Sequence, residues 1–342
     1  MVFVAEAQKR GCFLIDKLEL LLALAKERHF GRAAEACGVT QPTMSTSLKQ
    51  LEEILGVMLV QRGSRFQGFT PEGERTLDWA RRIVGDARAM RQEINTLKDG
   101  LSGEIAIAAI PTALGMVASL TTPFRARHPS VRFRIVSCTS IAVLGLLENL
   151  EVDAGLTYLD NEPVGRVNTV PLYYEEYRLL TSPAGALGDR DSVTWAEVGQ
   201  VPLCLLTPDM QNRRIIDALL RSAGQEPSPT LESNSMIVLF AHVRTGKWAS
   251  IMPAKLAETL GLTDNVRSIP IVEPAATHAV GLIVPHREPM TPLITALVTE
   301  ARALAKVMGQ SPAGVKNTSQ NKALAGKRGN EAAGAPRPRR RR

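Results

Sequence analysis

A turn at Gly38 between two short helical patterns constrains this chain more than any other feature of its sequence. Residues 32–37 are rich in alanine and predict a short, closely packed helix, and residues 40–54 predict a second one. Glycine tolerates the left-handed conformation that ends a helix. Thr40 can cap the second helix, and Pro42 is acceptable in its first turn. Two helices joined by such a turn are typical of a helix-turn-helix.

The second helix is predicted to have one apolar face and one polar face. Met44, Leu48 and Leu51 recur at helical spacing and indicate a buried stripe. The opposite face carries hydroxyl and amide side chains and has no carboxylate before Glu52. A plain bundle of amphipathic helices is the alternative interpretation. We expect Asp16 to cap the preceding helix, whose apolar face comprises Leu18, Leu21, Leu22 and Ala25.

The segment after these helices favours DNA binding over a plain bundle. Residues 57–73 predict a strand, a basic turn and a second strand. Such a hairpin would form a wing beside the second helix. Arg62 and Arg65 lie in its turn, where they could reach a nucleic acid.

Residues 14–72 resemble the N-terminal winged helix-turn-helix of LysR-type transcriptional regulators. The run FGRAAEACGVTQPTMSTSLKQLEEILGVMLVQRGSR, followed by FTPEG, carries the resemblance without a gap. It implies a recognition helix whose N-terminal residues meet base edges in the major groove. Lys49 and Arg32 would meet phosphates, and Arg65 would enter the minor groove. The expected DNA-binding residues are Arg32, Gln41, Pro42, Thr43, Ser45, Thr46, Lys49, Arg62 and Arg65.

Residues 73–100 predict one long helix with an apolar seam. The seam recurs with a 3-4-3-4-3 spacing, which is a heptad pattern, and charged residues fill the other faces. Packing of the seam onto its own domain is the alternative. In the LysR family this helix pairs two chains, which implies a homodimer or homotetramer on a palindromic or interrupted-palindromic operator. The expected dimerisation residues are Ala80, Ile83, Ala87, Met90, Ile94 and Leu97.

Residues 101–308 alternate short β-rich runs with helical runs, which predicts an α/β fold with a mostly parallel sheet. This half resembles the two-lobed effector domain of the LysR family, which is of periplasmic-binding-protein type. Lobe I is expected at about 101–178 and 278–308, and lobe II at about 182–274. The expected strands are 104–110, 131–137, 153–158, 175–182, 201–206, 229–233, 248–252 and 278–284.

A small-molecule pocket is expected between the lobes, outside the carboxyl ends of the strands. Thr112 and Ser140 are placed near helix starts, where hydroxyl and backbone N–H groups can bind an anion. The expected effector is therefore a small organic anion. A simple helix cap is the alternative for each hydroxyl. The expected effector-binding residues are Thr112, Thr139, Ser140, Thr207, Arg213 and Ser235.

No catalytic or metal-binding motif accompanies these patterns. The histidines form no H-x-x-x-H or H-E-x-x-H pair, and G-x-S-x-G, P-loop and G-x-G-x-x-G motifs are absent. The four cysteines lie too far apart for zinc-finger spacing or a disulfide framework. We therefore expect no metal, no cofactor and no enzymatic activity. An enzyme on the two-lobe fold, a purely architectural DNA-binding protein and a redox switch at Cys138 are the alternatives.

The basic charge is concentrated near the C-terminal end. The net charge is +7, and residues 309–342 hold nine Lys or Arg and one Glu. This tail is expected to be disordered, and either to add phosphate contacts of no sequence preference or to remain inert. No signal peptide or membrane span is recognisable, so we expect a cytoplasmic protein without membrane contact. The family resemblance implies RNA polymerase as a further partner.

Overall fold

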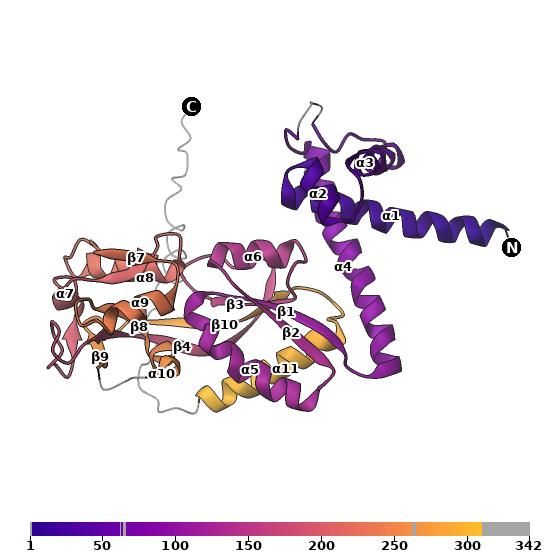
Figure 1. Cartoon of the computed structure of the whole chain (residues 1–342). Helices are drawn as coiled ribbons and strands as arrows, with labels where there is room; N and C mark the ends of the chain where they lie inside the picture. Colours follow the sequence, from indigo (N-terminus) through magenta and orange to yellow (C-terminus); the bar gives the residue numbers. More distant parts are fainter. Residues whose placement is uncertain (1, 62, 64–65, 262–264, 310–342) are drawn as a thin grey trace, which may run out of the picture.

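A computed structural model describes residues 2–61, 63, 66–261 and 265–309, with side chains from Leu14 onward except that of Asp99. Figure 1 shows a helical N-terminal region, one long helix and a two-lobed α/β region. Arg62, Arg65 and the basic tail from residue 310 onward lie outside the described residues. Within the described part, no helix is both long enough and apolar enough to cross a bilayer.

Four helices form the N-terminal region and the connection to the second half. The first helix begins earlier than expected, because it passes through Asp16 without a break, so the predicted cap at Asp16 is wrong. No proline in residues 2–16 would stop the helix from extending toward the N-terminus. The helices are α1 (Val2–Glu27), α2 (Phe30–Ala36), α3 (Gln41–Leu55) and α4 (Pro71–Asp99).

Local capping explains the boundaries of the helix-turn-helix. The imidazole Nδ1 of His29 accepts hydrogen bonds from the N–H groups of Gly31 (3.1 Å) and Arg32 (3.3 Å), so α2 begins before Gly31 and not after it. Gly38 has a φ of 66°, which confirms the predicted left-handed turn. Thr40 caps α3 as predicted, and its Oγ1 accepts from the N–H of Thr43 (3.3 Å).

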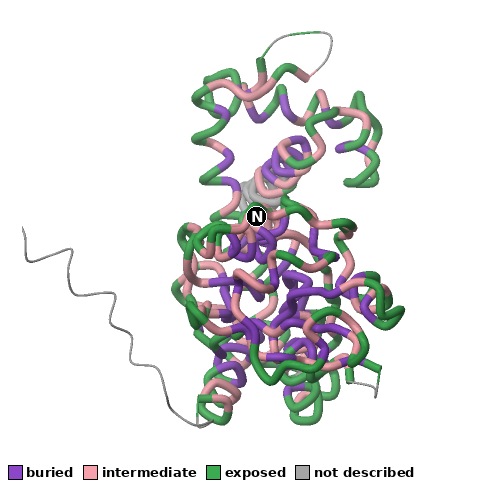
Figure 2. Tube along the Cα trace, turned by 90° about the vertical axis from the view of Figure 1, so that its left-hand side faces the viewer, coloured by how far each residue is buried: buried purple, intermediate pink, exposed green. Residues whose placement is uncertain are grey.

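The N-terminal core joins α1, α3 and the start of α4. Met44, Leu48 and Leu51 are buried, which confirms the predicted stripe of α3. Figure 2 shows this core separately from the larger one of the α/β region. The wing is less regular than predicted, because the described residues of its two arms form one isolated β-bridge, between Val60 and Phe69, in place of paired strands.

Lobe I is built on five strands in the order β2-β1-β3-β10-β4. β1 pairs in parallel with β2 and β3, whereas β10 is antiparallel to β3 and β4. The sheet is therefore mixed and not mostly parallel as expected, because β10 enters it from lobe II in the reverse direction. The strands are β1 (Gly103–Ala109), β2 (Val131–Ser137), β3 (Ala154–Tyr158), β4 (Val167–Thr181) and β10 (Thr277–Pro285).

Helices cover both faces of the lobe I sheet. In Figure 1, α5 and α11 lie below this sheet and α6 lies above it. A short 3₁₀ helix, Pro111–Ala113, leads from β1 into α5. The helices are α5 (Leu114–Arg127), α6 (Ser140–Glu148) and α11 (Pro292–Gly309).

β4 connects the two lobes, because it is long enough to belong to both sheets. Its first part pairs with β10 in lobe I, and residues 177–181 pair with β8 and β9 in lobe II. β5, β9, α7 and α10 were not expected from the sequence. The elements of lobe II are β5 (Val193–Thr194), α7 (Trp195–Val198), β6 (Cys204–Leu206), α8 (Gln211–Ser222), β7 (Leu231–Ser233), α9 (Met236–Val243), β8 (Ser250–Pro253), α10 (Ala254–Leu260) and β9 (Arg267–Val272).

Candidate functional site

The polar face of α3 lies open to solvent. Its predicted contact residues Gln41, Pro42, Thr43, Thr46 and Lys49 are exposed. Ser45 is half-buried beside the wing. The hydroxyls of Thr40 and Thr43 lie 2.9 Å apart, so the cap and the face share a hydrogen bond. The face is thus an exposed row of donors and acceptors on a rigid helix.

Lys49 lies in the middle of α3 and forms no ion pair among the described residues. Glu52 turns toward the wing, where its Oε1 accepts from the N–H groups of Leu59 (2.8 Å) and Val60 (3.2 Å). The Lys49 ammonium is therefore available at the surface. This arrangement suits a polyanion, because exposed cations and helix N-termini both favour phosphate.

Arg32 lies at the start of α2, next to the same surface. Its Nη2 donates to the carbonyl of Glu27 (2.7 Å), and its Nε is 3.5 Å from the Glu27 carboxylate. These contacts hold the guanidinium in place and use only part of its five donors.

An exposed apolar strip runs along one face of α4. The α4 strip comprises Ile83, Ala87, Met90, Ile94 and Leu97, of which Leu97 is 82% exposed and only Ala87 is half-buried. Ala80, expected in the same seam, is instead fully buried in the N-terminal core with Leu77 and Val84. The helix starts against its own domain, so the first position of the seam is used inside the chain.

The two lobes meet around a very small cavity. Thr112 and Ser140 from lobe I line it, as expected, together with Tyr158. Gln211 and Asn212 face them from lobe II. The cavity measures about 10 Å³, the lower limit for one water molecule. The lobes are therefore closed upon each other at this point.

A buried carboxyl group lies directly behind this cavity. The Tyr158 hydroxyl donates to Glu175, and Asn212 Nδ2 donates to the Tyr158 oxygen (3.0 Å). Burial raises the pKa of Glu175 to about 8, although the hydrogen bond from the Tyr158 hydroxyl opposes this rise. No Lys or Arg contributes to this shift, so Glu175 is largely protonated at neutral pH.

Several polar atoms around Glu175 lack a hydrogen bond within the part of the chain that the structure describes. They are Oε1 of Glu175 and the hydroxyls of Thr112 and Tyr177. Unsatisfied buried polar groups are costly and uncommon. Their concentration at the lobe junction indicates a site built for a ligand or for ordered water.

Sequence reasoning missed Glu175, and a period-two signal could have found it. Tyr173, Glu175 and Tyr177 alternate along β4 and all three point to the buried side. A carboxylate at an inward position of a strand is exceptional. Gln211 and Asn212 had no comparable signal, because only the docking of α8 against lobe I brings them to the cavity.

The other expected effector residues have different roles in the structure. Thr139 caps α6 through its Oγ1, which accepts from the N–H of Ala142 (3.2 Å). Arg213 is buried and pairs with Asp217 (2.7 Å) and Glu232 (2.6 Å), so its guanidinium is already occupied. Thr207 and Ser235 do not line the cavity between the lobes.

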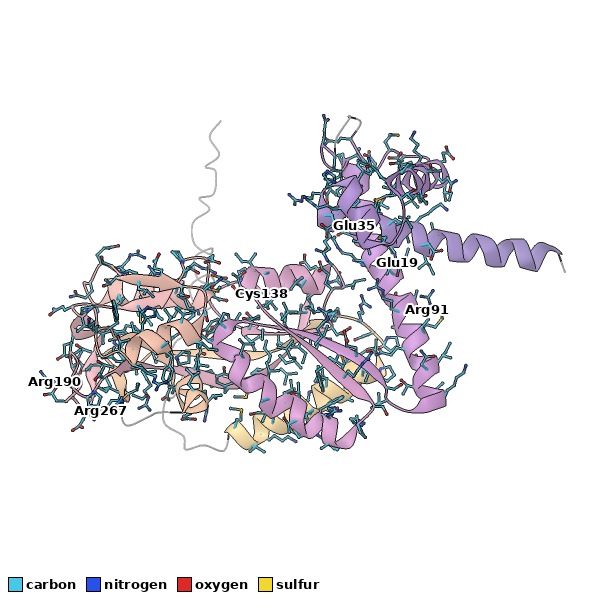
Figure 3. The ribbon with its side chains drawn as sticks, in the orientation of Figure 1. Glu19, Glu35, Arg91, Cys138, Arg190 and Arg267 are labelled. Atoms are coloured by element: carbon cyan, nitrogen blue, oxygen red, sulfur yellow. The ribbon has the colours of Figure 1, made fainter. Side chains whose placement is uncertain are left out.

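The thiols of Cys138 and Cys204 are not arranged for reactivity. Burial raises the pKa of Cys138, which lies beside α6 in Figure 3, and raises that of Cys204 to about 11. A raised pKa disfavours the thiolate, which is the reactive form. Among the described residues, no group of three or more His, Cys, Asp or Glu side chains could hold a metal ion.

Known regulators resemble this chain in sequence and in fold. OxyR of Escherichia coli K12, a DNA-binding transcriptional dual regulator, is 27% identical over 270 residues, which are 79% of this chain and 88% of OxyR. A probable nitrogen assimilation transcriptional activator of Synechococcus elongatus is 26% identical over 279 residues, 80% of this chain and 89% of that relative.

Solved structures of full-length regulators share the architecture. A full-length OxyR variant from Pseudomonas aeruginosa aligns with a TM-score of 0.66 and 24% identity, over 84% of this chain and 97% of that one. Full-length CbnR in complex with its target DNA aligns with a TM-score of 0.55 and 21% identity, over 85% and 99%. At these identities the likeness concerns the fold.

Two family models match the two halves of the molecule. The bacterial regulatory helix-turn-helix protein model of the lysR family matches residues 15–74. The LysR substrate binding domain model matches residues 98–306, more than half of the chain. The protein therefore belongs to the LysR family of DNA-binding transcriptional regulators.

Proposed function

We propose that this regulator binds an interrupted palindromic operator as a homodimer or homotetramer, and that a small molecule bound between its lobes changes promoter activity. The exposed polar face of α3, mounted on the buried stripe of Met44, Leu48 and Leu51, carries the proposal. Such a face offers donors and acceptors to base edges, while its rigid support fixes their positions.

Within this surface we assign distinct roles. Gln41 reads a base with its amide, with Thr43, Ser45 and Thr46 beside it and Pro42 packing against the groove. Lys49 and Arg32 meet phosphates, which position the protein without specifying sequence. Arg62 and Arg65, which lie outside the described residues, would bind DNA from the wing.

The α4 strip supports dimerisation. Exposed apolar residues at heptad spacing lose contact with water when two such helices pair. Pairing through residues 83–97 would hold two copies of α3 at a constant separation, so each dimer would read two half-sites. The proposal assigns one role to each segment. DNA binding belongs to residues 14–72, dimerisation to residues 73–100 and effector binding to residues 101–308.

Effector binding requires the lobes to separate. The cavity of about 10 Å³ between them is too small for any metabolite. Thr112 and Ser140 on one lobe and Gln211 and Asn212 on the other offer hydroxyl and amide groups to a polar ligand. A ligand that binds the open form would shift the balance between closed and open lobes.

The ligand need not be the small anion expected from helix-start hydroxyls. Glu175 lies behind the cavity with one oxygen unpaired, and the described residues that line the cavity include no Lys or Arg to attract an anion. A neutral or donor-rich effector fits the centre better. Thr139, Thr207, Arg213 and Ser235 have only supporting roles in this proposal.

A thiol-based peroxide response is not supported. Several relatives are named hydrogen peroxide-inducible genes activators. In this chain, burial raises the pKa of Cys37, Cys138 and Cys204, which disfavours their thiolates. We propose reversible effector binding in the cytoplasm without catalysis, with RNA polymerase as the downstream partner. The basic tail would add contacts to DNA of no sequence preference.

Selection from random DNA tests the proposal directly. The full chain is mixed with a random duplex pool, and the retained DNA is sequenced. We expect an interrupted palindrome to be enriched, and a thermal-shift screen of neutral and charged metabolites should then find a ligand that alters operator binding. Retention of DNA without any sequence enrichment would favour an architectural role instead.

A further inference from the structure

A second cavity lies between α4 and lobe I, and none of its lining residues belongs to the lobe junction. It measures about 230 Å³ and is bounded on one side by Gly85, Arg88 and Ala89 of α4. The other side includes Asp153 of lobe I and Arg287 after β10. This volume is below that of drug-sized pockets, roughly 300–1,000 Å³, and suits a small metabolite.

The lack of a side chain at Gly85 leaves room for the guanidinium of Arg287. A β-carbon at Gly85 would collide with the guanidinium of Arg287, so the arginine lies directly against the backbone of α4. Glycine in the middle of a helix costs about 1 kcal/mol relative to alanine. The close approach of this guanidinium explains why a glycine is found at this position of the helix.

The Arg287 guanidinium is partly buried and has no close anionic partner. Among the described residues, none forms an ion pair or hydrogen bond with it. Burial lowers the pKa of Arg287, while the more distant carboxylates of Asp86 and Asp153 oppose that change. Asp153 Oδ2 instead accepts from the N–H of Ala106 (2.8 Å).

The rest of the lining is mainly apolar. Val152, Met290 and Ile294 form a wall beside the two guanidinium groups of Arg88 and Arg287. Arginine binds carboxylates through two parallel hydrogen bonds, and the donors of Arg287 are otherwise unused here. We propose that this cavity is a second ligand site, which binds a small organic carboxylate with an apolar body.

A ligand bound in this cavity would contact both α4 and lobe I, and so would affect how the N-terminal half is attached to the α/β half. Arg88 already donates to the carbonyl of Leu150 in lobe I (3.3 Å) and to Glu19 of α1 (3.2 Å). The cavity residues and the α4 strip lie on different faces of the helix, because Gly85 is two positions from Ile83. A carboxylate there ties α4 to lobe I without competing for the dimer face.

Calorimetric titration of the full chain tests the site. The probes are phenylacetate and cyclohexanecarboxylate, and their amides are the uncharged controls. We expect both carboxylates to bind at millimolar concentration, and Arg287→Gln to weaken them about tenfold or more, since a charged hydrogen bond is lost. Gly85→Ala should weaken them too, because its methyl group displaces the flexible end of Arg287.

Two control variants show whether the bound carboxylate occupies this cavity or the lobe junction. Gly145→Ala changes a helical glycine that has open space around it, so carboxylate binding should be unchanged. Thr112→Val alters the lobe junction and should also leave it unchanged. The proposal is overturned if neither carboxylate binds, if the amides bind equally well, if Arg287→Gln binds normally, or if Thr112→Val removes the binding.

Discussion

The α3 face and the lobe junction both present polar side chains, but they differ in how these side chains are placed and how far they are buried. The α3 face is a continuous stretch of one helix, and its polar side chains lie in water above a buried apolar stripe. The lobe junction gathers Thr112, Tyr158, Glu175 and Asn212 from four separate segments and buries them all. A surface for DNA can thus be encoded locally, whereas a buried polar centre depends on how distant segments dock.

The difference also predicts how the two regions respond to change. Exposed side chains contribute to binding and little to folding, because water replaces the contacts they lose. Buried polar side chains contribute to both, because an unpaired partner left behind is costly. Substitutions in the two regions should therefore differ in how they affect DNA binding and stability.

The largest effect is expected at the α4 strip, which lies in the locally encoded half. Ile94→Asp places a charge in the apolar strip and should convert the dimer to a monomer. Operator affinity should then fall about a hundredfold or more, because the second half-site no longer contributes. Light scattering and a gel-shift titration measure the two effects. Asn95→Asp is the matched control, since it adds the same charge beside the strip. A dimeric Ile94→Asp protein would place the interface elsewhere.

The next effect concerns the buried centre and depends on pH. The pKa of Glu175 is raised to about 8 in the folded protein, above its unfolded value of about 4.3. The protonated carboxyl therefore stabilises the fold fully below about pH 4, and this contribution is lost as the pH rises through 8.

Glu175→Gln removes this titration while keeping the shape of the side chain. The melting temperature of the variant relative to the parent should increase steadily between pH 5 and 8 and level off above pH 8. Thermal denaturation at several pH values measures this. Exposed Glu176 on the same strand gives the matched control, Glu176→Gln, which should show no such trend. Parallel pH profiles for the parent and Glu175→Gln would mean that the carboxyl is ionised when folded.

A moderate effect is expected on the α3 face. Gln41→Ala should reduce affinity for the operator by ~1–3 kcal/mol and leave binding to random DNA nearly unchanged, since it removes a base contact. Lys49→Ala should weaken both and lower the salt slope by about one unit, since it removes a phosphate contact. Neither should shift the melting temperature. An equal loss on both kinds of DNA for Gln41→Ala would remove it from the base-reading set.

The last and smallest effect is expected at Thr112, in the buried lobe junction. Its hydroxyl is buried and has no hydrogen bond within the described residues. Thr112→Val replaces this hydroxyl by a methyl group of similar size, so the unfolding free energy should change by less than about 1 kcal/mol. The effector-induced change in operator binding should nevertheless weaken. An unchanged effector titration would move the ligand site away from this turn.

Sequence patterns predicted the helix-turn-helix closely because its signals are local. The Gly38 turn, the Thr40 cap and the stripe of Met44, Leu48 and Leu51 each depend on neighbours within two helical turns. The start of α1 was mispredicted, because Asp16 is a good cap that the helix simply passes. His29 was overlooked as the cap of α2, because an imidazole is an uncommon choice.

The family, the order of the domains, most strands and helices, and the polar face of α3 could be predicted from the residues alone. Three features became visible only in the folded molecule: Ala80 belongs to the N-terminal core, Arg213 pairs with Asp217 and Glu232, and Glu175 is buried with one oxygen unpaired. Periodicity reports which face of an element is apolar, but it does not report which distant element covers that face. Burial and pairing of polar groups depend on that second choice, and so does the chemistry of the lobe junction.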